Sequence, residues 1–321
     1  MDNTSTMSGP HEVFAGVQFG TGAWAWGDRL LWGYGRDYGD DDLRAVFHAS
    51  LKAGITLFDT AEVYGQGRSE VLLGRFIQES GQQVRVATKF MPFPWRLSRG
   101  SALRALRGSL KRLGRDKVEL YQIHMPFPPL SIETWIEAFA DLVQSGLIGA
   151  VGVSNYDRDQ TQRAYDVLIH QGIPLASNQV EYHLLNRKIE KNGLLKHCQE
   201  LGVTVMAYSP LAQGLLTGKF TPETPPKGVR SRFGIKLLRK IQPLIKLMRQ
   251  IGADHAGKTP GQVAINWTMY KGTFTIPGAK NQRQMEENAG ALGWSLTADE
   301  VAALDEASDR IYSSKSRSAS N

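Results

Sequence analysis

The segment VRVATKFMPFPWRLSRGSALRALRGSLKRLGRDKVELYQIHMP, residues 84–126, contains one complete unit of the fold that the sequence predicts. Its first residues, Val84 to Thr88, form a short apolar and β-branched run, which is typical of a buried strand. A helical pattern follows over Arg99 to Leu113, and Gly114 stands where helices often end in a left-handed residue. A second strand pattern runs from Glu119 to Ile123. The segment therefore predicts strand, helix and strand in succession, the unit of a parallel sheet.

The same unit recurs along most of the chain. Strand patterns lie at Val17–Gly20, Thr56–Phe58, Val84–Thr88, Glu119–Ile123, Ala150–Val153, Ala176–Val180, Thr204–Ala207 and Phe274–Ile276. Helical patterns lie between them at Asp42–Ala53, Ser69–Glu79, Arg99–Leu113, Ile132–Gln144, Asp159–His170, Asn192–Leu201 and Pro260–Tyr270. From the second strand to the seventh, the starts are about 30 residues apart, the length of one strand-helix unit. Eight units predict an α/β fold closed into a (β/α)8 TIM barrel, because an open doubly wound sheet usually has fewer strands and a G-x-G-x-x-G turn, which this sequence lacks.

The predicted barrel forms one domain over residues 13–312. Residues 1–12 and 313–321 are polar and without a pattern, which predicts flexible tails. The long gap between the seventh and eighth strands, Ser209 to Thr273, predicts an inserted loop with an extra helix. Within this gap, Lys227 to Arg249 holds eight basic residues and no acidic one, interleaved with apolar residues. This pattern predicts an amphipathic helix with a solvated basic face, which could restart at Pro243. Two alternatives for the basic residues are the attraction of a phosphorylated cofactor and a surface that binds nucleic acid or membrane.

Composition is that of a globular protein. Of the 321 residues, 41% are hydrophobic and 21% are charged, and the formal net charge is +7. Cys198 is the only cysteine, so no intrachain disulfide can form and a reducing compartment is the simpler assumption. No apolar run has the length of a membrane span, and the amino terminus lacks a signal pattern. We therefore expect a cytoplasmic protein without a membrane or nucleic-acid partner.

Polar residues follow the predicted strands at the end where barrel active sites lie. Asp59, Lys89 and His124 each come directly after a strand pattern, and Tyr64 lies in the loop beyond Asp59. Later strands end in further hydrogen-bonding groups, namely Ser154, Asn155, Gln179, Glu181, Tyr208 and Ser209. Each residue alone has a structural explanation, as a cap, a surface charge or a packed ring. Their joint occurrence at strand ends instead favours a catalytic site.

These four residue types suit the reduction of a carbonyl. Tyr64 would donate the proton, and a neighbouring cation, Lys89, would make its anion easier to form. Asp59 would hold and neutralise the ammonium group of Lys89 in a closed site. His124 would donate to the carbonyl oxygen as charge develops there.

At these residues the chain resembles the aldo-keto reductase superfamily. The matching segments are GTGAWAWGD (20–28), LFDTAEVYGQGRSEVLLG (57–74), ATKF (87–90), LYQIHMP (120–126), GVSN (152–155), NQVEYH (178–183), AYSPLAQGLLTGKF (207–220) and IPGAKNQRQMEEN (276–288). The last two segments and SRFG (231–234) are similar to the branch of channel β-subunits, aflatoxin aldehyde reductases and plant or cyanobacterial pyridoxal-reductase-like enzymes. The resemblance implies that Asp59, Tyr64, Lys89 and His124 form a catalytic tetrad.

The resemblance also implies a nicotinamide cofactor, NADPH in preference to NADH. Ser154, Asn155 and Gln179 would bind its carboxamide, and Tyr208 would stack on its ring. The remaining expected cofactor residues are Gly22, Ala23, Trp24, Asp59, Ser209, Leu211, Gly214, Lys219, Arg232, Gly278, Lys280, Gln284, Glu287 and Asn288. Gln284 and Gly278 stand where many members carry arginine and lysine, so the preference for NADPH depends on Lys280.

Four side chains are expected in the substrate pocket: Trp26, Trp32, Trp95 and Met125. They predict a small carbonyl substrate in an apolar pocket, although packing under loops is an equal alternative for the tryptophans. Gly252 to Thr259 matches the phosphate-loop pattern, but it follows a helical segment instead of a strand, and we reject ATP binding. His183, His197 and Cys198 lack the spacing of metal ligands, so no metal is expected.

Two other function classes are alternatives to a reductase. The first is a regulatory subunit that senses bound nucleotide for a partner, as in the channel β-subunits of the same branch. The second is a barrel hydrolase with paired carboxylates, which fails because only Asp59 and Glu181 are candidates and nothing pairs them. The natural substrate and the oligomeric state stay open at this level.

Overall fold

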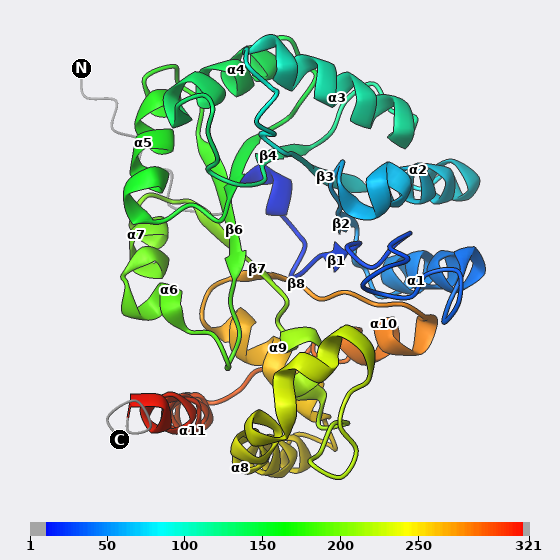
Figure 1. Cartoon of the computed structure of the whole chain (residues 1–321), viewed down its shortest axis with the longest axis vertical. Helices are drawn as coiled ribbons and strands as arrows, with labels where there is room; N and C mark the ends of the chain where they lie inside the picture. The colour runs from blue at the N-terminus through cyan, green and yellow to red at the C-terminus, as the bar shows by residue number, and fades with distance from the viewer. Residues whose placement is uncertain (1–10, 317–321) are drawn as a thin grey trace.

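The computed structural model describes residues 11–316, and they form a barrel of eight parallel strands (Figure 1). The strands pair in chain order: β1 (Thr21–Gly22), β2 (Leu57–Asp59), β3 (Arg85–Phe90), β4 (Leu120–Ile123), β5 (Val151–Ser154), β6 (Leu175–Glu181), β7 (Thr204–Tyr208) and β8 (Phe274–Ile276). Parallel bridges from Phe19 to Thr275 and from Gly22 to Gly278 bring the first and last strands together. The predicted (β/α)8 barrel is therefore confirmed.

Helices lie outside the strands, as Figure 1 shows. They are α1 (Asp40–Lys52), α2 (Arg68–Ser80), α3 (Gly100–Leu113), α4 (Ile132–Gln144), α5 (Arg158–Ile169), α6 (Lys188–Lys191), α7 (Leu194–Glu200), α8 (Gly234–Asp254), α9 (Pro260–Tyr270), α10 (Gln282–Ala289) and α11 (Ala298–Ser316). Shorter 3-10 turns are η1 (Glu12–Phe14), η2 (Tyr64–Gly67), η3 (Ala212–Thr217) and η4 (Gly228–Phe233). None of these helices is long and apolar enough to cross a membrane.

Helix ends follow the glycine signals of the sequence. Gly81 and Gly114 both have φ of +63° and accept the left-handed conformation that closes α2 and α3. Each outer helix buries one face, so that α3, for example, buries Leu106, Leu110 and Leu113. The local signals and the packing thus agree along these units.

The interior of the barrel is closed at the amino ends of the strands. Phe14 from η1 packs against Phe274 at the start of β8, with ring centroids 4.8 Å apart. Leu57 and Leu120, at the starts of β2 and β4, belong to the same buried cluster. Because apolar side chains fill this end, the open end of the barrel lies at the carboxyl ends of the strands.

Four predicted boundaries were wrong. The first strand is Thr21–Gly22, not Val17–Gly20, because pairing with Phe58 and Asp59 of β2 decides its position. The helix predicted over Asn192–Leu201 is the shorter α7, Leu194–Glu200, because Gly193 before it has φ of +78°; the single turn α6 precedes it. Helix α11 runs to Ser316 and so includes four residues assigned to the flexible tail. At the other end, His11 caps η1 and Glu12 begins it, although both were assigned to the tail 1–12. Residues 1–10 and 317–321 lie outside the described part.

The insertion between β7 and β8 contains the predicted extra helix. Helix α8 is continuous through Pro243, without a restart. It buries Leu238, Ile241 and Met248 and exposes Lys246 and Arg249, which confirms an amphipathic helix with a solvated basic face.

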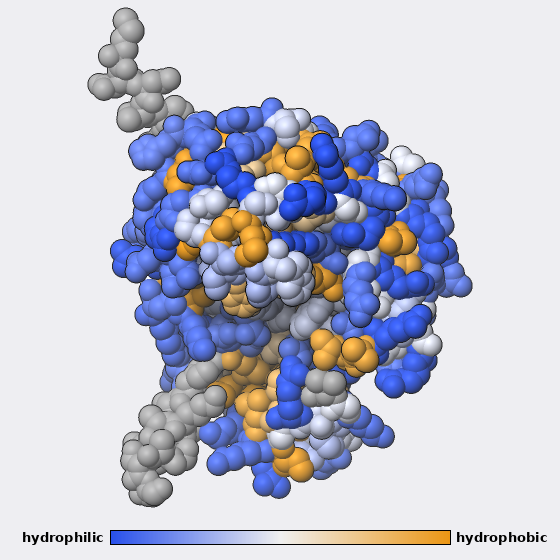
Figure 2. All heavy atoms as spheres, turned by 45° about the horizontal axis from the view of Figure 1, so that its top comes forward, coloured by the Kyte–Doolittle hydropathy of each residue, from blue (hydrophilic) through white to orange (hydrophobic). Residues whose placement is uncertain are grey.

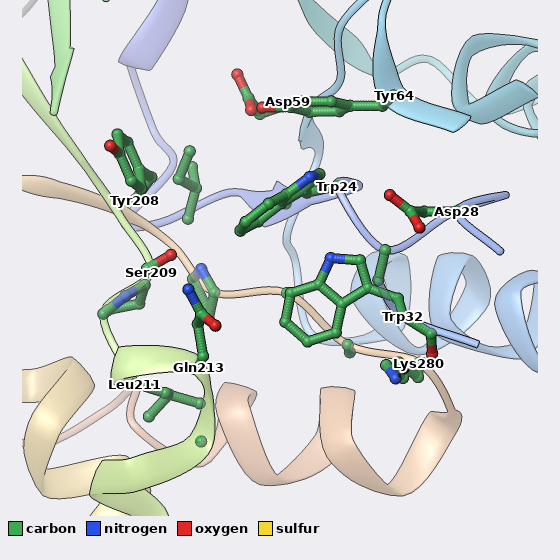
Figure 3. A pocket seen from close by; sticks show the side chains of 18 of the residues that line it. Trp24, Asp28, Trp32, Asp59, Tyr64, Tyr208, Ser209, Leu211, Gln213 and Lys280 are labelled. Carbon is green, nitrogen blue, oxygen red and sulfur yellow. Dashed lines mark hydrogen bonds between the residues drawn. The ribbon is translucent and has the colours of Figure 1, made fainter. Parts of the chain in front are cut away.

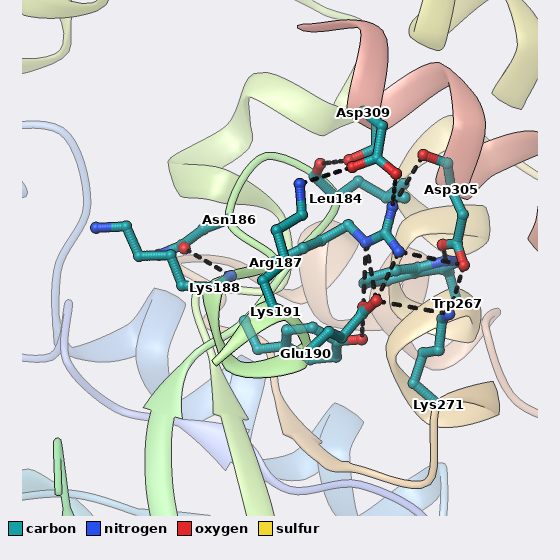
Figure 4. Close-up of polar contacts among 12 residues, drawn as sticks. Leu184, Asn186, Arg187, Lys188, Glu190, Lys191, Trp267, Lys271, Asp305 and Asp309 are labelled. Carbon is teal, nitrogen blue, oxygen red and sulfur yellow. Dashed lines mark hydrogen bonds and ion pairs between the residues drawn. The ribbon is translucent and has the colours of Figure 1, made fainter. Parts of the chain in front are cut away.

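A buried arginine attaches α11 to the barrel (Figure 4). Arg187, which is 7% exposed, donates to Glu190 Oε2 at 2.6 Å and to the carbonyl oxygen of Asp305 at 2.9 Å. The Asp305 carboxylate accepts bonds from Trp267 Nε1 of α9 at 2.9 Å and from Lys271 Nζ, at the residue that follows α9, at 2.5 Å. These contacts connect three segments that are far apart in the sequence.

Candidate active site

A cavity of about 770 Å³ opens at the carboxyl ends of the strands. Its wall includes residues at or just after each strand end, among them Gly22, Asp59, Met91, His124, Ser154, Gln179, Tyr208 and Ile276. The loop after β1 and the insertion after β7 complete the wall (Figure 3). In the space-filling view, a hollow separates the barrel from the lobe that contains α8, and apolar side chains lie along it (Figure 2).

Three of the four predicted catalytic side chains form one hydrogen-bonded chain at this cavity. Lys89 Nζ lies 2.6 Å from Asp59 Oδ2 and 3.3 Å from Tyr64 Oη. The carbonyl oxygen of Thr60 accepts a further bond from Lys89 Nζ at 2.8 Å. The fourth side chain, His124, meets Tyr64 edge to face, with ring centroids 5.7 Å apart. The tertiary structure therefore brings together all four residues.

A close contact between two loops sets the position of Tyr64. The next residue, Gly65, has φ of +54°, and a Cβ there would lie 2.8 Å from the carbonyl carbon and oxygen of Gly27. Only glycine lets the loop after β2 approach the loop after β1 this closely. Trp24, from the same neighbouring loop, lies beside Tyr64 with ring centroids 6.4 Å apart (Figure 3).

Burial dominates the ionisation of the pair at the centre of the site. It raises the pKa of Tyr64 well above the ordinary value, and the negative charge of Asp59 raises it further. Burial also lowers the pKa of Lys89, against the opposing effect of Asp59. The sequence led us to expect that Lys89 would make the tyrosinate easier to form, but the effect of burial is larger. Tyr64 therefore keeps its proton near neutral pH, which is the state that a proton donor needs.

His124 is neutral in this environment. Burial, with a smaller contribution from Lys89, lowers the pKa of His124 to about 3. Its Nδ1 is buried and has no hydrogen-bond partner among residues 11–316. Because an N–H at Nδ1 would stay unsatisfied, the proton is expected on Nε2, where it can be donated into the cavity.

Two buried amides hold the other oxygen of Asp59. Gln179 Nε2 donates to Asp59 Oδ1 at 2.8 Å, and Gln122 Nε2 donates to the same oxygen at 3.2 Å. Gln122 was not among the residues predicted from the sequence. Gln122 is the residue before the last residue of β4, within the strand and not after it. The only sign of its role in the sequence is a single glutamine within an apolar run.

The residues expected at a nicotinamide carboxamide form a row of hydrogen bonds beside the tetrad. Asn155, with φ of +61°, donates from Nδ2 to the carbonyl oxygen of His124 at 3.1 Å and to Ser154 Oγ at 3.0 Å. Its Oδ1 accepts a bond from Tyr208 Oη at 3.1 Å. Ser154 Oγ donates to the carbonyl oxygen of Gln179 at 2.9 Å. The cavity thus has amide and hydroxyl groups next to the reactive side chains.

Basic side chains gather at the opposite end of the cavity. Lys219, Arg230, Lys280 and Arg283 all line it. Lys280 Nζ donates to the carbonyl oxygen of Trp32 at 2.6 Å and lies on the far side of Trp32 as seen from Tyr64 (Figure 3). Burial and the charge of Arg230 lower the pKa of Lys280 to about 8. This end of the cavity is therefore suited to an anion.

The cavity fits an extended, phosphorylated nucleotide. Between its two ends, Gly214 has φ of +94°, and the Lys219 ammonium lies 3.3 Å from the position that a Cβ of Gly214 would take. A Cβ on Gly22 would lie 2.9 Å from the carbonyl oxygen of Ile276, so the backbone stays bare there. Helix α10 begins beside Lys280, with Asn281 as its cap, and directs its positive end toward this region. The cavity therefore combines open space, accessible backbone and positive charge, as binding of a phosphorylated nucleotide requires.

Most predicted site residues line the cavity, and five do not. One of the five is Lys89, which is fully buried and contacts the wall residues Asp59 and Tyr64. Trp26 is fully buried under the loops, against Phe58 and Phe76, so it is a core residue. Trp95 is 70% exposed and stacks on Phe93, away from the cavity. Ala23 is buried, and its backbone N–H donates to the carbonyl oxygen of Asp59. Arg232 lies outside the cavity wall and donates to the side-chain oxygen of Gln213.

Arg230 takes the position in the cavity wall that was expected for Arg232. The two residues are two apart in the same 3-10 turn, so charge pattern alone could not separate them. Other lining residues that sequence reasoning missed include Asp28, Leu31, Val63, Met91, Gln213 and Arg283. The predicted residues Trp24, Trp32 and Met125 are in the wall.

The phosphate-loop pattern at Gly252 to Thr259 joins α8 to α9 and does not follow a strand. The amide of Lys258 donates to the carbonyl oxygen of Gly252 at 2.7 Å, so that N–H is already in use. No cluster of three or more histidine, cysteine, aspartate or glutamate side chains in residues 11–316 could hold a metal ion.

Comparison with known proteins identifies the family of this chain. The model of the Aldo/keto reductase family matches residues 17–309. The chain is 44% identical over 299 residues to the chloroplastic pyridoxal reductase of Arabidopsis thaliana, covering 89% of this chain and 81% of the relative. It is 33% identical to the L-glyceraldehyde 3-phosphate reductase of Escherichia coli O157:H7, covering 82% of each.

Solved structures show the same likeness. The glycerol dehydrogenase of Gluconobacter oxydans has a TM-score of 0.80 and 31% identity, with 91% of each chain covered. An aldo/keto reductase of Klebsiella pneumoniae, solved with NADP and acetate, has a TM-score of 0.71 and 29% identity, with 90% of each chain covered. The family match spans most of the sequence and the tetrad lies at the open end of the barrel, so this chain belongs to the aldo/keto reductase family of oxidoreductases.

Proposed function

We propose that this protein reduces an uncharged aldehyde or reactive ketone at the expense of NADPH, with Tyr64 as the proton donor. The observation that supports this most directly is the position of Lys89 Nζ, within hydrogen-bond distance of both Asp59 Oδ2 and Tyr64 Oη. A bound reduced nicotinamide supplies the hydride. Every other requirement of the reaction falls on the side chains of this chain.

The proposed roles follow from the ionisation of each group. Tyr64 holds its proton until the carbonyl oxygen gains charge, and Lys89 then stabilises the phenolate that remains. Asp59 keeps the ammonium group of Lys89 in place. The neutral His124 donates from Nε2 to the carbonyl oxygen and fixes its orientation.

The preference for NADPH over NADH is supported by the basic end of the cavity. Lys219, Arg230, Lys280 and Arg283 line it, with Glu287 as an acidic neighbour. Ammonium and guanidinium groups are the usual partners of a phosphate monoester, and NADH lacks this group. The preference therefore rests on more residues than Lys280 alone, although Gln284 and Gly278 replace basic residues common in the family.

The substrate end of the cavity is apolar. Trp24, Leu31, Val63, Met91 and Met125 line the wall around the tetrad. A carbonyl compound with an apolar body and no negative charge suits this wall, because a desolvated anion there would lack a free basic partner.

Replacement of Tyr64 by phenylalanine tests the proposal. Tyr64→Phe should lower kcat for a simple aromatic aldehyde by about 100-fold or more, while NADPH binding measured by fluorescence is retained. Phe93→Leu, at a residue outside the cavity wall, serves as a control and should keep its turnover. Unchanged turnover in Tyr64→Phe would refute the role of the phenol. Tightly retained nucleotide with negligible wild-type turnover would instead favour a nucleotide-sensing regulatory protein.

A further inference from the structure

Gln122 is a buried polar residue with no assigned role. It lies in β4, opposite Lys89 of β3 and Gly152 of β5, and its side chain is fully buried inside the barrel. Its Nε2 donates to Asp59 Oδ1 at 3.2 Å, and its Oε1 accepts a bond from Gln179 Nε2 at 3.3 Å. Both ends of this amide are therefore engaged with residues of the site.

The two oxygens of Asp59 have different partners. Oδ2 faces Lys89, whereas the donors to Oδ1 among residues 11–316 are the neutral amides of Gln179 and Gln122. A carboxylate that is 2% exposed needs donors on both oxygens, since an unsatisfied charged oxygen in the interior is costly. The amides thus fix the rotation of the carboxylate that places Oδ2 on Lys89.

Only one of these two amides can be recruited by a ligand. Gln179 lines the cavity, and a cofactor carboxamide can compete there for its Nε2. Gln122 is not part of the cavity wall and lies behind Gln179. If Gln179 turns toward a ligand, Gln122 is the donor that stays on Asp59 Oδ1.

The neighbouring strand leaves room for this arrangement. A Cβ on Gly152 would lie 2.8 Å from Gln122 Cγ and 2.5 Å from Ser177 Oγ. The absence of a side chain at Gly152 therefore lets Gln122 reach across the barrel toward Asp59. Within residues 11–316, Asp59 Oδ1 is the one acceptor of the Gln122 amide.

We propose that Gln122 is a positioning residue, which holds Asp59 Oδ1 so that Asp59 keeps Lys89 against Tyr64 when the cofactor occupies Gln179. This inference rests on the proposed reductase function. It assigns no contact between Gln122 and substrate or cofactor, so its effect should appear in kcat and in the pH profile, not in nucleotide affinity.

Replacement of Gln122 by methionine, Gln122→Met, tests this role because methionine has a similar volume and no donor. We expect kcat to fall about 10-fold, the contribution of one hydrogen bond to a charged group, with a change in NADPH Kd of less than about 3-fold. If Asp59 rotates away without this amide, Lys89 and Tyr64 lose a negative neighbour that raises the pKa of both groups, so both release their protons at lower pH. The alkaline limb of the kcat profile should move down by about half a pH unit or more. The other titratable groups near this site, His124 and Glu70, are unchanged in the variant.

Ser177→Ala is the matched control. Ser177 Oγ is buried beside Gly152 and makes no hydrogen bond within residues 11–316. It should therefore keep wild-type kcat and the wild-type pH profile, which separates the loss of the amide from a general disturbance of the barrel interior.

Two results would overturn the proposal. Turnover and an alkaline limb equal to wild type in folded Gln122→Met would do so, as would equal changes in Ser177→Ala. If the wild-type protein reduces no aldehyde, the proposed function fails separately, and a crystal structure of Gln122→Met with bound NADPH then decides the role of Gln122. An Asp59 Oδ2 still 2.6 Å from Lys89 would reject it, and a rotated carboxylate would support it. If Gln122→Met is too unstable for kinetics at high pH, the same crystal structure decides the role of Gln122 in place of the pH profile.

Discussion

Replacement of Lys89 by methionine removes a positive charge that supports both proton donation by Tyr64 and the stability of the fold. Lys89 is fully buried, and its Nζ lies 3.3 Å from Tyr64 Oη. Two unit charges at this separation interact by about 5 kcal/mol at an effective dielectric constant of about 20. With about half a charge on Oη in the transition state, the loss is about 2.5 kcal/mol, or roughly 70-fold in kcat.

The same substitution also affects stability. It leaves the buried carboxylate of Asp59 without its counter-ion, and breaking a buried pair in this way costs about 3–5 kcal/mol. The double variant Lys89→Met with Asp59→Asn removes both charges and should regain most of this stability, but none of the turnover. Comparison of the two variants therefore separates the catalytic effect of the cation from its effect on folding.

The assay follows the loss of NADPH absorbance with a simple aromatic aldehyde, and thermal denaturation by circular dichroism gives the stability. The nucleotide affinity, measured by fluorescence, should change little, because Lys89 does not line the cavity. A folded Lys89→Met protein with turnover within about 3-fold of wild type would refute the assignment of the cation to transition-state stabilisation.

Three further predictions concern the cofactor, the substrate and the fold. Because the pKa of Lys280 is lowered to about 8, its charge is lost as pH rises, so the preference for NADPH over NADH should fall between about pH 7 and about pH 9. Ratios of the two Kd values measure this, and a Lys280→Met protein should show a smaller preference with no such fall. Met125→Arg places a cation in the apolar wall and should raise kcat/KM for 4-carboxybenzaldehyde relative to benzaldehyde by about 10-fold; an unchanged ratio would place Met125 outside substrate contact. Arg187→Met leaves the Glu190 carboxylate without its closest cation and should destabilise the protein by about 3 kcal/mol in urea denaturation, with kcat unchanged. Wild-type stability in this variant would show that the fold, including the attachment of α11, does not depend on Arg187.

Periodic patterns determined the fold class because strand and helix periods are local properties. Each strand-helix unit carried its own apolar run, its helical pattern and its terminal glycine, as at Gly114. The position of β1 could not be determined in this way. Only two residues, Thr21 and Gly22, form that strand, and their pairing with β2 is a long-range choice that propensity does not contain.

Within the site, the sequence identified the polar residues that follow strands, since the carboxyl ends of parallel strands meet at one end of a barrel. It did not separate Arg230 from Arg232, or Trp32 from Trp26, because neighbouring residues on a turn or loop differ only in the direction of the side chain. It also missed Gln122, whose function depends on a bond across the barrel to Asp59. Residue types and their order thus determined the fold class and the four candidate catalytic residues. The tertiary structure decided orientation, burial and ionisation, because these depend on side chains that are distant in the sequence and close in space.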